Sequence, residues 1–263
     1  MTQTSAKLTA ITRELSPDIG NCELTFLPRV RIDPALAQQQ HERYQAALSS
    51  LGCEVVQVPT EPGLADSVFI EDTALVLDEL AVILRPGPRS RRAELDGVEH
   101  VLRQYRPLAL IRPPGTVDGG DLLRVEKVIF AGLSSRTNAD GIEQLRKIVA
   151  DYGYSVKTVE TTQCLHLKSA VSAVAPGTLL INPNWVSRSS FDAFDQVDID
   201  EHEAHAANAV LVGQSVIYPS SFPRTSDRLV NRGIDVIPVD LSELQKAEGA
   251  VTCCSLLLSS PAV

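Results

Sequence analysis

Short apolar runs and longer amphipathic segments alternate along the chain in a recurring order. Residues 72–86 contain two β-rich runs around a polar turn, residues 90–105 carry apolar side chains at helical spacing, and residues 108–114 form another short apolar run. Apolar positions three or four residues apart are typical of an amphipathic helix, whereas short branched runs between turn signals are typical of strands. This part of the chain therefore predicts the order strand–strand–helix–strand.

The same order recurs further along the chain. Hairpins are predicted at 119–133, 168–183 and 208–220, helices at 138–153, 189–196 and 222–233, and closing strands at 155–161, 197–200 and 234–239. The two chain ends supply the remaining copy, in which a strand at 8–15, a helix at 33–52 and a strand at 53–59 lack one strand that residues 251–259 can provide.

Five copies of about 50 residues each predict a closed radial array in which neighbouring copies bury one another's apolar faces. A generic α+β sandwich with accidental regularity is the alternative. The complementary chain ends favour the closed array. We therefore predict one α/β propeller domain over residues 1–263, with pseudo-five-fold symmetry and a C-terminal strand that closes the first repeat.

Composition and charge narrow the class of protein. The 263 residues are 44% hydrophobic and 22% charged, as in ordinary globular domains. The net charge of −9 argues against nucleic acid or an anionic membrane as a partner. No apolar run approaches the roughly 20 residues that cross a bilayer, and the N-terminus lacks the pattern of a secretion signal. We expect a cytoplasmic protein whose five cysteines are reduced.

Polar residues that could take part in catalysis or binding lie near the start of successive copies. They are Asp66, Glu71 and Asp72 in the second copy, Asp118 and Asp121 in the third, His166 and Lys168 in the fourth, Asn208 in the fifth, and Cys253 and Cys254 in the strand that completes the first. Equivalent positions meet at the axis of a pseudo-symmetric ring, so these groups can line one shared pocket.

Taken singly, each of these residues has a simpler interpretation. An isolated aspartate such as Asp66 or Asp72 is typical of a turn or cap, and His166 between two leucines is typical of a core histidine. Cys254, in phase with two leucines of the strand predicted over 251–259, is explained by packing alone. Carboxylates, a histidine and a cysteine at matching repeat positions together favour a functional site.

The adjacent cysteines allow several kinds of chemistry. A disulfide between them is disfavoured because neighbouring Cα atoms are about 3.8 Å apart, closer than a disulfide prefers. No Cys-x-x-Cys or histidine pair supports structural zinc. A nucleophilic set of cysteine, histidine and aspartate remains, with Cys253 on the strand face opposite Cys254.

Six motifs occur in an order that resembles one enzyme family. They are "ADSVFIEDTA", "RPGPRSRR", "VDGGDLL", "GLSSRTN", "LHLKS" and "EGAVTCCS". Together they resemble the dimethylarginine dimethylaminohydrolase (dimethylargininase) family, in the guanidino-group-modifying, arginine deiminase-like superfamily, over residues 13–255. The resemblance implies the pentein fold, a five-bladed ββαβ α/β-propeller, which agrees with the repeats.

The resemblance also implies a reaction. The substrate would be Nω,Nω-dimethyl-L-arginine or Nω-monomethyl-L-arginine, and Cys253 would attack its guanidinium carbon. His166 would protonate the departing dimethylamine or methylamine and then activate water, which hydrolyses a covalent S-alkylthiouronium intermediate to L-citrulline. Asp118 would orient His166. A bound guanidinium cation would favour the thiolate, so the substrate would help to activate its attacker.

Substrate-binding residues follow from the same motifs. Asp72 would pair with the guanidinium, Asp66 would help to hold the ligand, and Glu71 would line the site. Arg91 and Arg136 would grip the substrate carboxylate, because a planar guanidinium suits two oxygens.

Backbone carbonyls near Leu24 and Ala247 would receive the substrate α-amino group. No step calls for a metal or cofactor, and zinc at Cys253 and His166 would act as an inhibitor. We expect a small cationic substrate, no nucleic-acid or membrane partner, and a monomer or homodimer.

Three other functions stay open at this point. The same chemistry could act on another guanidine such as free arginine, although a typical arginine deiminase carries a helical insertion that this chain lacks. An amine in place of water would make the protein an amidinotransferase. A binding protein on an inactive propeller is the alternative from a different class, and the presence of Cys253, His166 and Asp118 argues against it.

Overall fold

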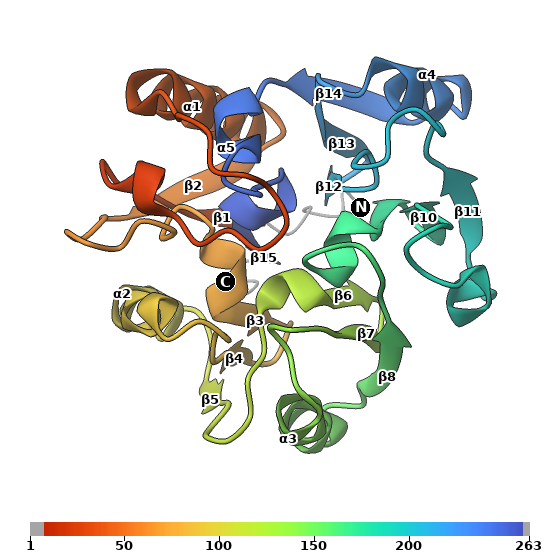
Figure 1. Ribbon diagram of the computed structural model, residues 1–263. Coiled ribbons are helices and arrows are strands. Elements are labelled where there is room, and N and C mark those ends of the chain that lie inside the picture. Colours follow the sequence, from red (N-terminus) through yellow and green to blue (C-terminus); the bar gives the residue numbers. More distant parts are fainter. Residues whose placement is uncertain (1–7, 260–263) are drawn as a thin grey trace, which may run out of the picture.

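Each of the five repeats contains one three-stranded sheet, and the sheets form a ring (Figure 1). The computed structural model describes residues 8–259. Within each sheet the first and second strands in blade order run antiparallel, and the second and third run parallel. This arrangement confirms the predicted five-bladed propeller of strand–strand–helix–strand repeats.

The strands of the five sheets lie close to the predicted segments. In blade order they are β15 (Leu256–Ser259), β1 (Leu8–Arg13) and β2 (Cys53–Val58); β3 (Ala74–Val76), β4 (Ala81–Ile83) and β5 (Leu108–Leu110); β6 (Leu122–Val125), β7 (Val128–Leu133) and β8 (Ser155–Glu160); β9 (Val171–Ala175), β10 (Thr178–Ile181) and β11 (Asp195–Asp198); and β12 (Val210–Val212), β13 (Ser215–Pro219) and β14 (Asp235–Val239).

Helices connect the parallel strands on the outside of the ring (Figure 1). They are α1 (Pro34–Ser50), α2 (Leu95–Leu102), α3 (Ala139–Ala150) and α4 (Pro223–Asn231), with a one-turn 3-10 helix at Arg188–Phe191 in the fourth repeat. A short additional helix, α5 (Ser242–Gln245), follows β14 and does not connect parallel strands. Capping residues in the local sequence mark where the longer helices begin. Asp33 accepts hydrogen bonds from the first-turn amides of α1, which begins with a proline, and Asn138 caps α3.

The C-terminal strand completes the first sheet, as predicted. β15 pairs antiparallel with β1, with Leu8 opposite Ser259 and Ile11 opposite Leu256. On its other edge β1 pairs parallel with β2. Parallel strands require a crossover connection, and α1 forms it. The ring is therefore closed by the two ends of the chain.

Neighbouring sheets bury their apolar faces against each other. Ile11 of the first sheet lies in one buried cluster with Ile83 of the second. Leu180 of the fourth sheet shares another cluster with Val216 of the fifth. Burial between repeats explains how such short strands form a stable unit.

The cysteine pair departs from its predicted conformation. The sequence predicts that residues 251–255 belong to the final strand, but Thr252–Cys254 is a 3-10 helix and the strand begins only at Leu256. The Cys253 amide donates to the carbonyl of Ala250 at 3.2 Å, and the Thr252 amide donates to the side chain of Asn208 at 3.1 Å. These bonds replace a strand ladder, so the expectation that the two thiols lie on opposite strand faces is wrong.

None of the helices described between residues 8 and 259 is long and apolar enough to cross a membrane. The cytoplasmic location and the monomeric or homodimeric state stay predictions.

Candidate active site

Four one-turn 3-10 helices bring the polar residues of successive repeats to the centre of the ring. They are Ile70–Thr73 before β3, Gly119–Asp121 before β6, Leu167–Ser169 before β9 and Thr252–Cys254 before β15. The first contacts the second and the fourth, and the second also contacts the third. Matching repeat positions therefore meet in space, as the pseudo-symmetry predicts.

His166 lies between two carboxylates of the neighbouring repeats. Its Nε2 atom is 3.2 Å from Oδ2 of Asp118 and 4.0 Å from Oδ1 of Asp72, and all three residues are buried. Burial by itself lowers the pKa of His166, but the carboxylates, Asp72 first, raise it to about 9. His166 is therefore an imidazolium at neutral pH and can donate a proton.

Glycines allow the third repeat to approach this histidine. A Cβ atom on Gly120 would lie 2.4 Å from Nδ1 of His166, and one on Gly119 would lie 1.9 Å from the carbonyl oxygen of Glu71. The Gly120 amide donates to Oδ1 of Asp72 at 2.8 Å. The "DGGD" sequence is thus needed for close packing of backbone against the imidazole.

Arg91 does not present a free guanidinium. Its Nη1 atom lies 2.5 Å from Oδ2 of Asp72, and Nη2 lies 2.8 Å from Oε2 of Glu94. Nη2 also donates to the carbonyl oxygens of Asp66 and Phe69. The role of Arg91 in gripping a substrate carboxylate stays a prediction, and the observed contacts assign it the charge compensation of Asp72.

Asp72 is ionised because of these neighbours. Burial favours its neutral form, but His166 and Arg91 together lower the pKa of Asp72 to about 2. A buried carboxylate that remains charged suits the binding of a cation.

Glu71 connects the turn of Cys253 to the segment that follows His166. One carboxylate oxygen of Glu71 pairs with the ammonium group of Lys168, and the other accepts a hydrogen bond from the Thr252 hydroxyl at 2.7 Å. Asn208 binds the same two segments: its Nδ2 donates to the carbonyl of Lys168 and to Oγ1 of Thr252, both at 3.0 Å. The two halves of the predicted catalytic pair are thereby braced against each other.

The two cysteines occupy different surroundings although both are buried. Burial first, and then the carboxylates of Glu71 and Asp72, raises the pKa of Cys253 above its ordinary value. Cys254 is fully buried and its Sγ atom lies 3.5 Å from the carbonyl of Ala250. Successive residues of a 3-10 helix point about 120° apart, so the two thiols point in different directions.

The 23–27 segment covers this region. The Glu23 amide donates to both carboxylate oxygens of Asp66, at 3.1 and 3.2 Å, and Leu24 packs against the apolar cluster that contains Ala247 and Cys253. Nη2 of Arg136 donates to Oγ1 of Thr25 at 2.9 Å. Asp66, Leu24, Arg136 and Ala247 therefore lie at one side of the site, and their roles toward a ligand stay predictions.

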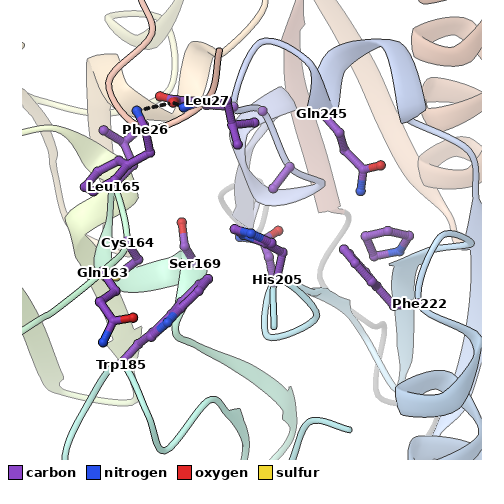
Figure 2. Close-up of a pocket in the computed structure, with 15 residues that line it drawn as sticks. Phe26, Leu27, Gln163, Cys164, Leu165, Ser169, Trp185, His205, Phe222 and Gln245 are labelled. Atoms are coloured by element: carbon purple, nitrogen blue, oxygen red, sulfur yellow. Dashed lines mark hydrogen bonds between the residues drawn. The ribbon is translucent and has the colours of Figure 1, made fainter. Parts of the chain in front are cut away.

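A mostly apolar cavity of about 270 Å³ adjoins the same segment. Figure 2 shows Phe26 and Leu27 at one end of it and Trp185, His205 and Phe222 around it. Asn208 and Ala250 also line the cavity, so it borders the turn that carries Cys253.

Asp72, Asp118 and His166 offer ligand atoms within 4.8 Å of one another, a spacing that could hold a cation. Asp72 also binds Arg91 and Gly120, and Asp118 also accepts a hydrogen bond from the amide of Gly87 at 2.9 Å. The roles of these three residues toward a substrate stay predictions.

Sequence reasoning missed several contributors. Glu94, Thr252 and Glu248 bind site residues or the 23–27 segment through side-chain contacts. The "EGAVTCC" sequence placed Thr252 and Glu248 near Cys253, but no sequence pattern distinguished them from ordinary turn residues. Asn208 stood out only as a repeat-equivalent polar residue.

Comparison with known proteins shows the family to which the chain belongs. The sequence matches the family model described as N,N dimethylarginine dimethylhydrolase, eukaryotic, over residues 29–258. The chain belongs to the dimethylarginine dimethylaminohydrolase family. It is 38% identical to the Streptomyces coelicolor member over 95% of this chain and 96% of that protein. It is 37% identical to the Pseudomonas aeruginosa member over 85% of this chain and 89% of that protein.

Solved structures agree with this assignment. The Pseudomonas aeruginosa enzyme, as a cysteine-to-serine mutant complexed with citrulline, has a TM-score of 0.90 and 33% identity and covers 95% of this chain and 98% of its own. The N-terminal domain of a cyanobacterial arginine dihydrolase, at 19% identity and a TM-score of 0.84, covers 96% of this chain and 98% of its own and shares the fold. Family membership confirms the predicted pentein fold and makes the protein a hydrolase of C–N bonds.

Proposed function

We propose that this protein hydrolyses Nω,Nω-dimethyl-L-arginine and Nω-monomethyl-L-arginine to L-citrulline and dimethylamine or methylamine. The observation that carries the proposal is the buried His166, protonated between Asp118 and Asp72, on a turn braced against that of Cys253. Family membership supports the substrate class, because the relatives are named for this reaction.

In the first half of the proposed reaction, the substrate guanidinium lies against Asp72 and Glu71. Burial and the same carboxylates disfavour the Cys253 thiolate, but the positive charge of the substrate lowers its free energy, so the thiol releases its proton to solvent water when the substrate binds. The thiolate forms a C–S bond with the guanidinium carbon, and the His166 imidazolium transfers its proton to the substituted nitrogen. The C–N bond then breaks, which releases the amine and leaves a covalent S-alkylthiouronium and a neutral imidazole.

In the second half, neutral His166 removes a proton from water, and the resulting hydroxide adds to the same carbon. The C–S bond breaks, its electron pair returns to sulfur, and a proton leaves the product oxygen to give L-citrulline. Asp118 holds the imidazole in place through both proton transfers. Each step uses groups of the chain and water, so the mechanism requires no metal or redox cofactor.

The other predicted residues have proposed roles in orienting the amino-acid part of the substrate. Arg136 binds the α-carboxylate, and Arg91 contributes positive charge while it compensates Asp72. Asp66 and the carbonyls of Leu24 and Ala247 surround the α-ammonium group.

The test is citrulline release from asymmetric dimethylarginine, monomethylarginine and arginine by the wild type, Cys253→Ser and Cys254→Ser. We expect turnover of the methylated substrates, an inactive Cys253→Ser variant and a largely active Cys254→Ser variant. An active Cys253→Ser variant beside an inactive Cys254→Ser variant would overturn the nucleophile assignment. Turnover of arginine alone would overturn the substrate assignment.

A further inference from the structure

Carboxylates accept hydrogen bonds from the backbone amides of Glu23 and Thr25, the two neighbours of Leu24. The Glu23 amide donates to both oxygens of Asp66, and the Thr25 amide donates to both oxygens of Glu248, at 3.0 and 3.1 Å. Asp66 and Glu248 come from distant parts of the chain. The backbone is therefore held by carboxylates at the residues before and after Leu24, and we call these contacts the clamp.

Glu248 makes the larger contribution to this clamp. Oε1 of Glu248 also accepts the amide hydrogens of Phe26 at 2.5 Å and Leu27 at 2.6 Å. A dashed line in Figure 2 marks the bond from Phe26. Successive backbone amides that converge on one point form a concave anion site, which a carboxylate fills with strong, charge-assisted bonds.

The clamp determines where the Leu24 carbonyl points. In a trans peptide the C=O and N–H groups point in opposite directions, so the Leu24 carbonyl points away from Glu248. Leu24 packs on the cluster that includes Ala247 and Cys253. The side chain of Thr25, the next residue, accepts a bond from Arg136. The 23–27 segment therefore carries two groups with predicted roles in binding the amino-acid part of the substrate. The Leu24 carbonyl is predicted to receive the α-ammonium group, and Thr25 contacts Arg136, which is predicted to bind the α-carboxylate.

The backbone at Glu248 supports a role for its side chain. Three non-glycine residues among those described have positive φ: Glu126, Gln163 and Glu248, the last at 59°. Glycine adopts this conformation more readily than any other residue. The hydrogen bonds from the amides of residues 25–27 to its carboxylate explain why a glutamate occupies this position.

We propose that Glu248 is a positioning residue for the substrate: its carboxylate closes the 23–27 segment and so fixes the Leu24 carbonyl against the substrate α-ammonium group. The identity of that substrate rests on the proposed function. Closure itself does not depend on it, so the two can be tested separately.

The first experiment follows hydrogen–deuterium exchange of the 25–27 amides in the wild type, Glu248→Ala and Glu248→Gln. Glu126→Ala is the matched control, because Glu126 is a glutamate with φ of 54° in the exposed turn between β6 and β7. We expect exchange about 10- to 100-fold faster in Glu248→Ala, the range for losing hydrogen bonds to a charged group. Glu248→Gln should be intermediate, since its amide oxygen is a weaker acceptor, and Glu126→Ala should match the wild type.

The second experiment compares KM and kcat for asymmetric dimethylarginine and for its analogue without the α-amino group. Glu248→Ala should raise KM for the amino acid about 10- to 100-fold with a much smaller change in kcat. The analogue should bind the wild type and Glu248→Ala equally weakly, because neither complex uses the Leu24 carbonyl.

Unchanged exchange at residues 25–27 in Glu248→Ala would overturn the clamp. An equal KM penalty for both compounds would overturn its role toward the α-ammonium group. If the wild type fails to turn over asymmetric dimethylarginine, the proposed function fails, whereas faster exchange in Glu248→Ala alone would still support the clamp.

Discussion

Oδ2 of Asp118 lies 3.2 Å from Nε2 of His166, and the carboxylate that makes this contact is itself immobilised. Its other oxygen accepts a hydrogen bond from the amide of Gly87, and the Asp118 amide donates to the Thr137 hydroxyl at 3.0 Å. The imidazole therefore meets an acceptor whose position is set by two other segments. A histidine oriented in this way can pass protons without first being repositioned.

Asp118→Asn should move the alkaline limb of the pH profile. The wild-type limb is expected near pH 9, where His166 loses the proton that the leaving amine requires. The substitution removes a charge that raises the pKa of His166, so the limb should shift to lower pH. We also expect kcat/KM to fall at least about 100-fold. Steady-state citrulline formation from pH 6 to 10 measures both effects, and an unmoved limb would contradict the role of Asp118.

Gly120→Ala should displace the imidazole. The added Cβ would lie 2.4 Å from Nδ1 and 2.7 Å from Cγ of His166, distances that no relaxed structure tolerates. We expect kcat to fall at least about 100-fold, as when a catalytic group moves by about 1 Å. Gly97→Ala is the control, because its Cβ would come no closer than 3.3 Å to Val58. Kinetics and thermal melts of both variants separate displacement of His166 from general destabilisation.

Asn208→Ala should reduce turnover as well as stability. Asn208 bonds the turn of Cys253 to the segment after His166, so its loss lets the two move independently. We expect kcat to fall about 10- to 100-fold.

Asn182→Ala is the matched control for this variant. Asn182 is also buried and makes two hydrogen bonds, to the carbonyl of Ala204 and from the amide of Asn184, away from the site. Both variants should lose about 1–3 kcal/mol of unfolding free energy, while only Asn208→Ala loses activity. Equal kcat values for the two would refute the bracing role.

His41 should make stability depend on mildly acidic pH. Burial lowers the pKa of His41 to about 4 in the folded protein, against 6.5 for an ordinary histidine. Between these two pH values the unfolded chain binds more protons than the folded protein. The contribution of His41 to the free energy of unfolding is therefore complete above pH 6.5 and is lost as the pH falls toward 4. The slope is at most about 1.4 kcal/mol per pH unit.

Urea unfolding of the wild type and His41→Leu at pH 7 and pH 5 measures this dependence. His41→Leu should lose less stability between the two pH values than the wild type does. His100→Gln, at an exposed position of α2, serves as the control and should retain the wild-type dependence. The same slope in His41→Leu as in the wild type would assign the acid sensitivity to other groups.

Local patterns in the chain were sufficient for the repeat order and for the closing of the ring. Apolar spacing, turn residues and caps such as Asp33 act over a few residues, and they predicted every strand of the five sheets to within a few positions. The same patterns failed at Thr252–Cys254, where side chains from remote segments overrule a strand-like sequence. Pseudo-symmetry could still place His166, Asp118 and Asp72 together, because equivalent positions of a ring meet at its axis.

Tertiary structure alone decided what each polar group binds. Only the folded chain pairs Arg91 with Asp72 and Glu94, joins Asn208 to Thr252, and brings Glu248 to the amides of residues 25–27. These partners are separated by up to 223 residues, and each contact depends on side-chain direction and on which competing donor lies nearest. Short-range periodicity carries no information about either, so the chemistry of the site was predictable from its residue types but the geometry that orders them was not.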